Sequence, residues 1–148
     1  MEIGIDSFAS AMYGSSLSSA DAMEQLLDRI VRADEAGLDV FGIGEHHKKE
    51  FLDSAPEVIL SAAAARTKRI LLGSAVKVLS TDDPVRVYQS FATLDLISKG
   101  RAELVVGRGS AIEAFPLFGF DLKDDDSLFA EKLDLLLQVR DQEYVTWS

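Results

Sequence analysis

Four short apolar runs recur along the chain, and each is followed by a stretch with helical periodicity. The runs begin near residues 3, 39, 70 and 102, so they repeat at intervals of 31 to 36 residues. After the first run, apolar residues recur at the spacing of an amphipathic helix, at Met23, Leu26, Leu27, Ile30 and Val31. Near-continuous apolar strands that alternate with helices are typical of a parallel sheet covered by helices.

The boundaries of these elements carry their own signals. Ser18 with Asp21 resembles a capping box, and Gly37 suits the left-handed residue that ends a helix. Ser54 and Asp83 each precede a proline-led helix start, as N-caps do. We therefore predict strands over residues 3–8, 39–45, 70–79 and 102–109, and helices from Ser18 to Gly37 and over residues 56–66, 84–97 and 127–140. Residues 144–147 have the residue types of a further strand.

Polar side chains stand where each predicted strand ends. They are Asp6-Ser7, Glu45-His46-His47, Ser80-Thr81 and Arg108 to Ser110. In a (β/α) barrel such ends form one ring around the active site, and an open doubly wound sheet also binds ligands at its carboxyl ends. An open sheet usually has a glycine-rich phosphate loop after its first strand, but residues 10–19 contain one glycine. We therefore predict an α/β fold of the (β/α)8 TIM-barrel type, with the first four βα units present.

The length of the chain limits this prediction. A complete barrel typically needs ~250 residues, and this chain has 148. We therefore expect residues 1–148 to be the N-terminal half of one barrel domain. A half barrel leaves its outer strands unpaired and its apolar interior open to water. The chain is thus expected to be part of a longer protein, or to pack against a second copy.

Composition narrows the classes of partner. The net charge of −10 argues against nucleic acid, which requires a basic face. The chain contains no cysteine, so disulfides and thiolate chemistry are excluded. The N-terminus lacks the pattern of a signal peptide, and no run approaches the ~20 apolar residues of a membrane span. We expect a cytoplasmic protein with no membrane partner.

Both histidines of the chain lie in Gly44-Glu45-His46-His47, directly after the second predicted strand. Histidine titrates nearest neutrality, so this is the first place to look for acid–base chemistry. A TIM-barrel metallohydrolase is an alternative, but such sites usually present His-x-His on one strand face. Adjacent side chains of a strand point to opposite faces, so the two rings should not share a cavity. We favour His46 over His47 and predict no metal site.

Five motifs in register now resemble one family. They are Gly44-Glu45-His46-His47, Leu72-Gly73-Ser74-Ala75-Val76, Asp83-Pro84-Val85-Arg86, Leu94-Asp95 with Ser98-Lys99-Gly100-Arg101, and Val106-Gly107-Arg108-Gly109. In this order they resemble the N-terminal half of the bacterial luciferase-like, flavin-dependent monooxygenases. The resemblance covers residues 1 to 148, and the fold of that family is a TIM barrel.

The resemblance implies roles for particular residues. His46 matches the essential histidine of the family and would assist acid–base chemistry near the flavin. The cofactor-binding positions would be Ala75, Val76, Gly107, Arg108 and Ser110. Ala75-Val76 matches a peptide, sometimes cis, that backs the flavin ring, and Arg108 matches an arginine directed toward the phosphate side. An ordinary buried strand and a surface salt bridge are the alternative interpretations of these two features.

The resemblance also implies an activity and partners. Reduced FMN and O2 would oxygenate a small organic substrate, with the reduced flavin supplied by a separate flavin reductase. A homodimer would form through the helices over residues 56–66 and 84–97. One branch of the family uses F420, so an F420- or FMN-dependent oxidoreductase or a non-catalytic flavin-binding paralogue is an alternative. A non-enzymatic assembly subunit is a further hypothesis, and the sequence does not identify the substrate.

Overall fold

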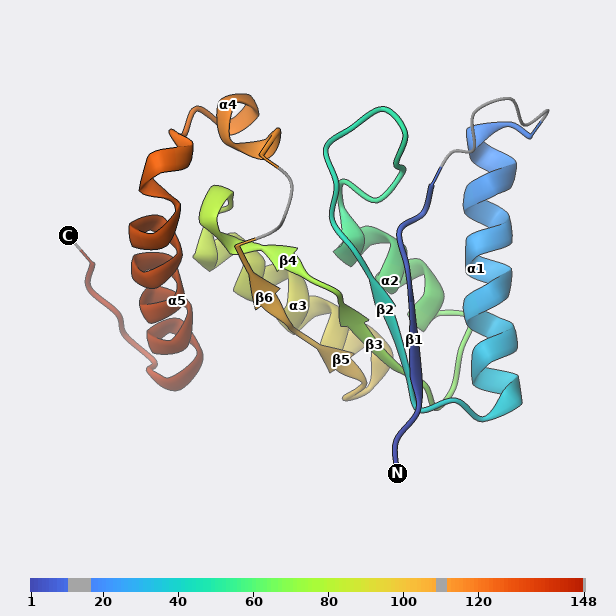
Figure 1. Cartoon of the computed structure of the whole chain (residues 1–148). Coiled ribbons are helices and arrows are strands. Elements are labelled where there is room, and N and C mark those ends of the chain that lie inside the picture. The colour runs from blue at the N-terminus through green and yellow to red at the C-terminus, as the bar shows by residue number, and fades with distance from the viewer. Residues whose placement is uncertain (11–16, 109–111, 148) are drawn as a thin grey trace.

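The computed structural model describes residues 1–10, 17–108 and 112–147 (Figure 1). The helices are α1 (Ser19–Ala36), α2 (Pro56–Ala64), α3 (Pro84–Ser98), α4 (Ala114–Phe118) and α5 (Asp125–Asp141). The strands are β1 (Gly4–Ser7), β2 (Val40–Ile43), β3 (Leu71–Ser74), β4 (Lys77–Val78), β5 (Ala102–Glu103) and β6 (Val106–Gly107). Two 3-10 turns, η1 (Leu79–Thr81) and η2 (Leu122–Asp124), complete the described elements. Among the described helices, none has both the length and the hydropathy that crossing a membrane requires.

The strands form a four-stranded sheet in the order β1-β2-β3-β5, with every neighbouring pair parallel. β4 and β6 continue β3 and β5 as a separate parallel pair. Figure 1 shows α2 and α3 lying together on one side of this sheet. The predicted α/β class and parallel sheet are therefore confirmed.

Three of the predicted helix ends are confirmed by their capping contacts. The Ser18 hydroxyl accepts a hydrogen bond from the backbone N–H of Asp21 at 3.1 Å. Gly37 ends α1 with a φ of 83°, a left-handed conformation that glycine adopts without a steric penalty. The Asp83 carboxylate caps α3 by accepting from the N–H groups of Val85 and Arg86. These caps fix the residues at which α1 begins and ends and at which α3 begins.

The third predicted strand, residues 70–79, is wrong as a single element. It divides into β3 and β4 at the Ala75–Val76 peptide, which is cis, and ends in η1. Beside this break the Ser74 hydroxyl donates to the Val105 carbonyl at 2.8 Å and accepts from the Val105 N–H at 3.0 Å. A side chain thus satisfies the backbone groups of Val105, and the fourth strand divides into β5 and β6 there. The sequence pattern is apolar apart from Gly73, Ser74 and Lys77, and it does not show that the Ser74 side chain replaces a backbone partner of Val105.

Two further predictions are corrected. Residues 144–147 form no strand, because the segment returns to α5, where Trp147 Nε1 lies 3.4 Å from Glu131 Oε1. The N-cap of α2 is Ala55, not Ser54, and it makes no side-chain hydrogen bond. The proline after it starts the helix without a hydroxyl cap, since the first turn needs no N–H from proline.

The register of the strands gives the sheet two different faces. Phe41 and Leu72 are neighbours in one row, and both are buried in the core beneath the helices. The next row contains Asp6, Gly42, Gly73 and Glu103 in the order of the strands. Because side chains alternate along a strand, this row lies on the opposite face. That face carries two central glycines between two carboxylates.

A buried carboxylate joins α1 to the start of β3. Asp34 is 7% exposed, and its oxygens accept from the backbone N–H groups of Lys68, Arg69 and Ile70 at 2.8, 3.0 and 2.8 Å. Burial alone would raise the pKa of Asp34, but these hydrogen bonds outweigh it and hold the pKa below its usual value. The end of α1 and the β3 strand are therefore locked together by one side chain.

Replacing this carboxylate should destabilise the fold. We expect Asp34→Ala to lower the free energy of unfolding by about 2 kcal/mol or more, because three N–H groups lose their acceptor. The loss of unfolding free energy should be complete above the ordinary pKa of an aspartate in the unfolded chain. It should become smaller as the pH falls through the lowered pKa of Asp34 in the folded state. Urea unfolding at several pH values measures it, with the exposed Glu35→Ala on the same helix as control. Equal effects of the two substitutions would contradict the assignment.

Candidate active site

The carboxyl ends of β1, β2 and β4 bring the predicted polar residues to one edge of the sheet. The segment after β2 runs directly into Glu45, His46 and His47, and all three are largely removed from solvent. The exposed fractions of the His46 and His47 side chains are 18% and 8%. The edge is therefore a partly covered site and not a solvated loop.

His46 is held on three sides. Its Nδ1 lies 3.1 Å from Oδ2 of Asp53. The Phe51 ring stacks on the imidazole, with centroids 4.3 Å apart and planes at 23°, and Phe8 meets it edge-on at 5.0 Å. A Cβ on Gly44 would lie 2.8 Å from the Phe8 ring and 3.1 Å from Cε1 of His46, so the approach requires glycine. The orientation of this imidazole is thus determined by its neighbours.

Asp53 is itself fully buried, with 0% of its side chain exposed. Its Oδ1 has no hydrogen-bond partner among the residues that the structure describes. Burial raises the pKa of Asp53 above its usual value. The hydrogen bond and charge of His46, and the backbone N–H groups of Asp53 and His46, act in the opposite direction. A desolvated carboxylate therefore serves a single recorded side-chain partner, which is His46.

His47 has a different set of contacts. Its Nε2 lies 3.0 Å from Oε1 of Glu45, and its ring meets Phe118 of α4 edge-on at 5.0 Å. The adjacent pair of histidines is thus divided between two carboxylates. Within residues 1–10, 17–108 and 112–147, no group of three or more histidine, aspartate and glutamate side chains is placed to hold a metal ion.

A buried lysine completes the edge, and sequence reasoning missed it. Lys77 is 4% exposed, and its Nζ lies 3.1 Å from Oε1 of Glu45 and 2.7 Å from Oδ2 of Asp82. Glu45 Oε2 also accepts from the Val78 N–H at 2.8 Å. Burial has the largest effect on the pKa of Lys77 and lowers it, but Glu45, Asp82 and Glu57 together raise it above its usual value. The available signal was a single lysine within an apolar run of the sequence.

The predicted cofactor-binding residues fall into two groups. Ala75, Val76 and Gly107 lie together, since a Cβ on Gly107 would be 2.8 Å from Cγ2 of Val76. Arg108 forms an ion pair with Asp126, and both side chains are largely exposed. This is the surface salt bridge that the sequence left as an alternative. Ser110 lies outside the described residues.

Two adjacent glycines lie on the face of the sheet opposite Phe41 and Leu72. Gly42 and Gly73 are neighbours on β2 and β3 and carry no side chain. A Cβ on Gly42 would lie 2.8 Å from Cβ of Ala75, so this methyl group already closes one side of the glycine surface. Both glycines are buried, so within the described residues their neighbours already cover this part of the backbone.

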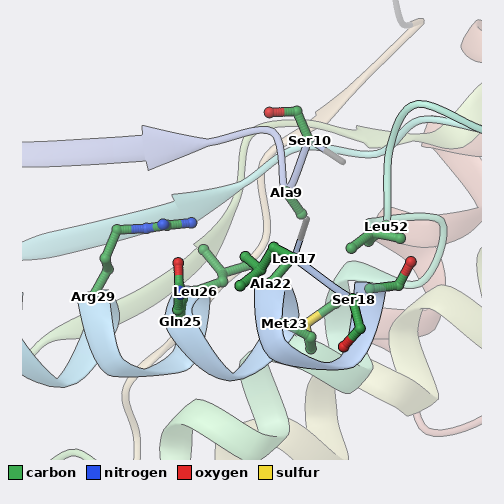
Figure 2. Close-up of a pocket in the computed structure, with 11 residues that line it drawn as sticks. Ala9, Ser10, Leu17, Ser18, Ala22, Met23, Gln25, Leu26, Arg29 and Leu52 are labelled. Atoms are coloured by element: carbon green, nitrogen blue, oxygen red, sulfur yellow. The ribbon is translucent and has the colours of Figure 1, made fainter. Parts of the chain in front are cut away.

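A cavity elsewhere does not suit this role. Figure 2 shows a pocket of about 100 Å³ between α1 and the segment that follows β1, with Leu26 and Arg29 of the helix among its lining residues. Small-molecule sites typically measure about 300–1,000 Å³. None of the predicted site residues lines this pocket. It lies beside α1 and is separate from the histidine edge.

Comparison with known proteins places this geometry in a wider context. An uncharacterised protein of Sinorhizobium fredii is 31% identical over 139 residues, which cover 93% of this chain and 40% of that protein. Limonene 1,2-monooxygenase of Rhodococcus erythropolis is 32% identical over 126 residues, which cover 84% of this chain and 33% of the enzyme. The chain thus spans well under half the length of these two relatives.

Solved structures share the fold. A monooxygenase from Streptomyces bottropensis matches with a TM-score of 0.90 and 27% identity, covering 100% of this chain and 45% of that chain. The oxygenating constituent of 3,6-diketocamphane monooxygenase from Pseudomonas putida, in complex with FMN, matches with a TM-score of 0.88 and 24% identity over 100% of this chain and 41% of its own. An F420-dependent secondary alcohol dehydrogenase, in complex with an F420–acetone adduct, gives a TM-score of 0.78 and 20% identity, covering 100% of this chain and 45% of that one. The last two likenesses concern the fold alone.

The sequence profile described as luciferase-like monooxygenase matches residues 1–148. The resemblance inferred from the five motifs is therefore confirmed. The whole-chain match, with a monooxygenase relative 32% identical over 84% of the chain, shows that this protein belongs to the luciferase-like monooxygenase family.

Proposed function

We propose that the chain is the N-terminal half of a TIM-barrel monooxygenase that uses reduced FMN and O2 to oxygenate a small organic substrate. The observation that carries this proposal is the fixed imidazole of His46 at the carboxyl edge of the parallel strands. It stands at the edge where barrel enzymes place their chemistry, and its Nδ1 is held 3.1 Å from a buried carboxylate. Such an arrangement suits a group that holds or moves one proton. The activity belongs to the complete barrel, of which residues 1–148 form one domain half.

Each residue has a task in this proposal. When bound, reduced FMN would supply the electrons with which O2 is activated. Ala75, Val76 and Gly107 would lie against the ring, and His46 would hold or deliver a proton at Nε2. Arg108 and Ser110 would lie toward the phosphate side, which requires the Arg108 guanidinium to exchange Asp126 for the phosphate. An exposed ion pair contributes little, so this exchange costs about 1 kcal/mol or less.

An F420- or FMN-dependent oxidoreductase is the second candidate. The F420-dependent alcohol dehydrogenase shares the fold of this chain. The two candidates differ in the use of O2, because a hydride-transferring oxidoreductase needs none. We favour FMN, since Glu45-His46-His47 together with Arg108 resembles the FMN branch of the family. A separate flavin reductase and a cytoplasmic location complete the proposal.

The function is tested with the complete protein and its cofactors. Reduced FMN mixed with O2 in the presence of the protein should show O2 uptake before the absorbance of oxidised flavin returns. His46→Asn should retain FMN binding but lower turnover by about 10²–10⁴-fold, as loss of an acid–base group does. His47→Asn is the control, with a smaller effect. Tight FMN binding without any dependence on O2 would favour the oxidoreductase instead.

The contact between Gly107 and Val76 generates a second prediction. Gly107→Ala should displace Val76 and weaken FMN binding by about tenfold, because overpacking costs about 1–3 kcal/mol. The double substitution with Val76→Ala removes the colliding methyl group and should restore most of the affinity. Fluorescence titration with FMN measures both. Failure of the second substitution to rescue the first would show that the contact does not shape the cofactor site.

A homodimer through α2 and α3 forms the third prediction. Val58 of α2 is 65% exposed and Leu96 of α3 is 81% exposed, although both are apolar. We expect the protein to sediment as a dimer and Val58→Glu to sediment as a monomer, since the substitution would bury an unpaired charge. Leu117→Glu on α4, at a residue 61% exposed, is the matched control and should leave the dimer intact. A monomeric wild-type protein would exclude this interface.

A further inference from the structure

Burying the Asp53 carboxylate costs free energy that its surroundings offset only in part. It is fully buried, Oδ1 has no hydrogen-bond partner among the described residues, and Oδ2 lies 3.1 Å from Nδ1 of His46. Burying a carboxylate with half of its hydrogen-bonding capacity unused destabilises a fold. Packing alone does not explain a carboxylate at this buried position.

The neighbouring histidine supplies a contrast within the same structure. Asp53 meets His46 at Nδ1, whereas Glu45 meets His47 at Nε2. A neutral imidazole carries one proton, and the nitrogen that faces a carboxylate is the one that keeps it. The two adjacent rings should therefore be opposite tautomers, with Nδ1–H on His46 and Nε2–H on His47.

We infer that Asp53 is a positioning residue that holds the proton of His46 on Nδ1 and so leaves Nε2 unprotonated at the site edge. A carboxylate oxygen accepts a hydrogen bond, so the Oδ2 of Asp53 favours the proton on the ring nitrogen that faces it, which is Nδ1. The stacked Phe51 ring and the edge of Phe8 oppose a half-turn flip of the imidazole. Such a flip would place carbon atoms where Nδ1 and Nε2 now lie. Asp53 acts only through His46.

This role of Asp53 rests on the proposed function of His46, but it is measured independently of monooxygenase activity. An unprotonated Nε2 accepts a proton from a substrate or cofactor group and returns it, as an acid–base histidine must. The tautomer itself exists without any flavin, so it is visible in the free protein. A failure of the monooxygenase proposal would leave the tautomer unaffected, and the converse also holds.

The experiment records long-range proton–nitrogen NMR spectra of the complete, nitrogen-15-labelled protein above the pKa of the histidines. Substitutions His46→Gln and His47→Gln assign the two rings. We expect a protonated Nδ1 and a pyridine-like Nε2 for His46, with the reverse pattern for His47. A proton on Nε2 of His46 in the wild-type protein would overturn the inference. This holds also if the spectra show that Asp53 carries the proton that lies between it and Nδ1.

Asp53→Asn supplies the second measurement. The amide removes the charge and can donate to Nδ1, so the Nδ1–H population of His46 should fall while the spectrum of His47 stays unchanged. Turnover with FMN should fall at least about tenfold, and FMN affinity should change less than about twofold. An unaltered His46 tautomer in a folded variant would contradict the positioning role. If the variant does not fold, the wild-type spectrum still decides the question.

Discussion

The Glu45 carboxylate is the contact on which the arrangement of this edge depends. Its two oxygens reach the Lys77 ammonium, the Val78 N–H and the His47 ring at 3.1, 2.8 and 3.0 Å. These partners belong to β4 and to the loop after β2, so one buried side chain joins the ends of two strands. Its position directly before His46 also means that any shift of Glu45 displaces the imidazole. The electrostatic network and the His46 imidazole are therefore one structural unit.

The different surroundings of the two histidines follow from this arrangement around Glu45. His47 belongs to the electrostatic network and, through Phe118, connects it to α4. His46 faces the other way, into an aromatic enclosure closed by Asp53. The two rings lie after the end of β2 and contact different carboxylates and different aromatic rings. Two identical side chains one residue apart thus have different partners.

The sequence predicted the parallel sheet and the principal helices because those depend on periodicity and local capping. The observed helices α2, α3 and α5 agree with the predicted ranges within two residues. The division of the third strand was not predictable, since it depends on Ser74 meeting Val105 from a distant segment. Asp53 and Lys77 were missed for a related reason. Their significance comes from burial and from partners in space, and neither is visible in a list of residue types.

The pairings of the four-stranded sheet all join distant parts of the chain: Gly4 with Val40, Val40 with Leu71, and Leu72 with Ala102. Each closes a loop of about thirty residues or more, and such non-local pairing makes folding slow. During that interval the β1 edge remains available to neighbouring molecules, with Ile3 and Ile5 about half exposed even in the folded chain. The net charge of −10 opposes such encounters through mutual repulsion. The acidity of the chain thus contributes to keeping slowly folding copies apart.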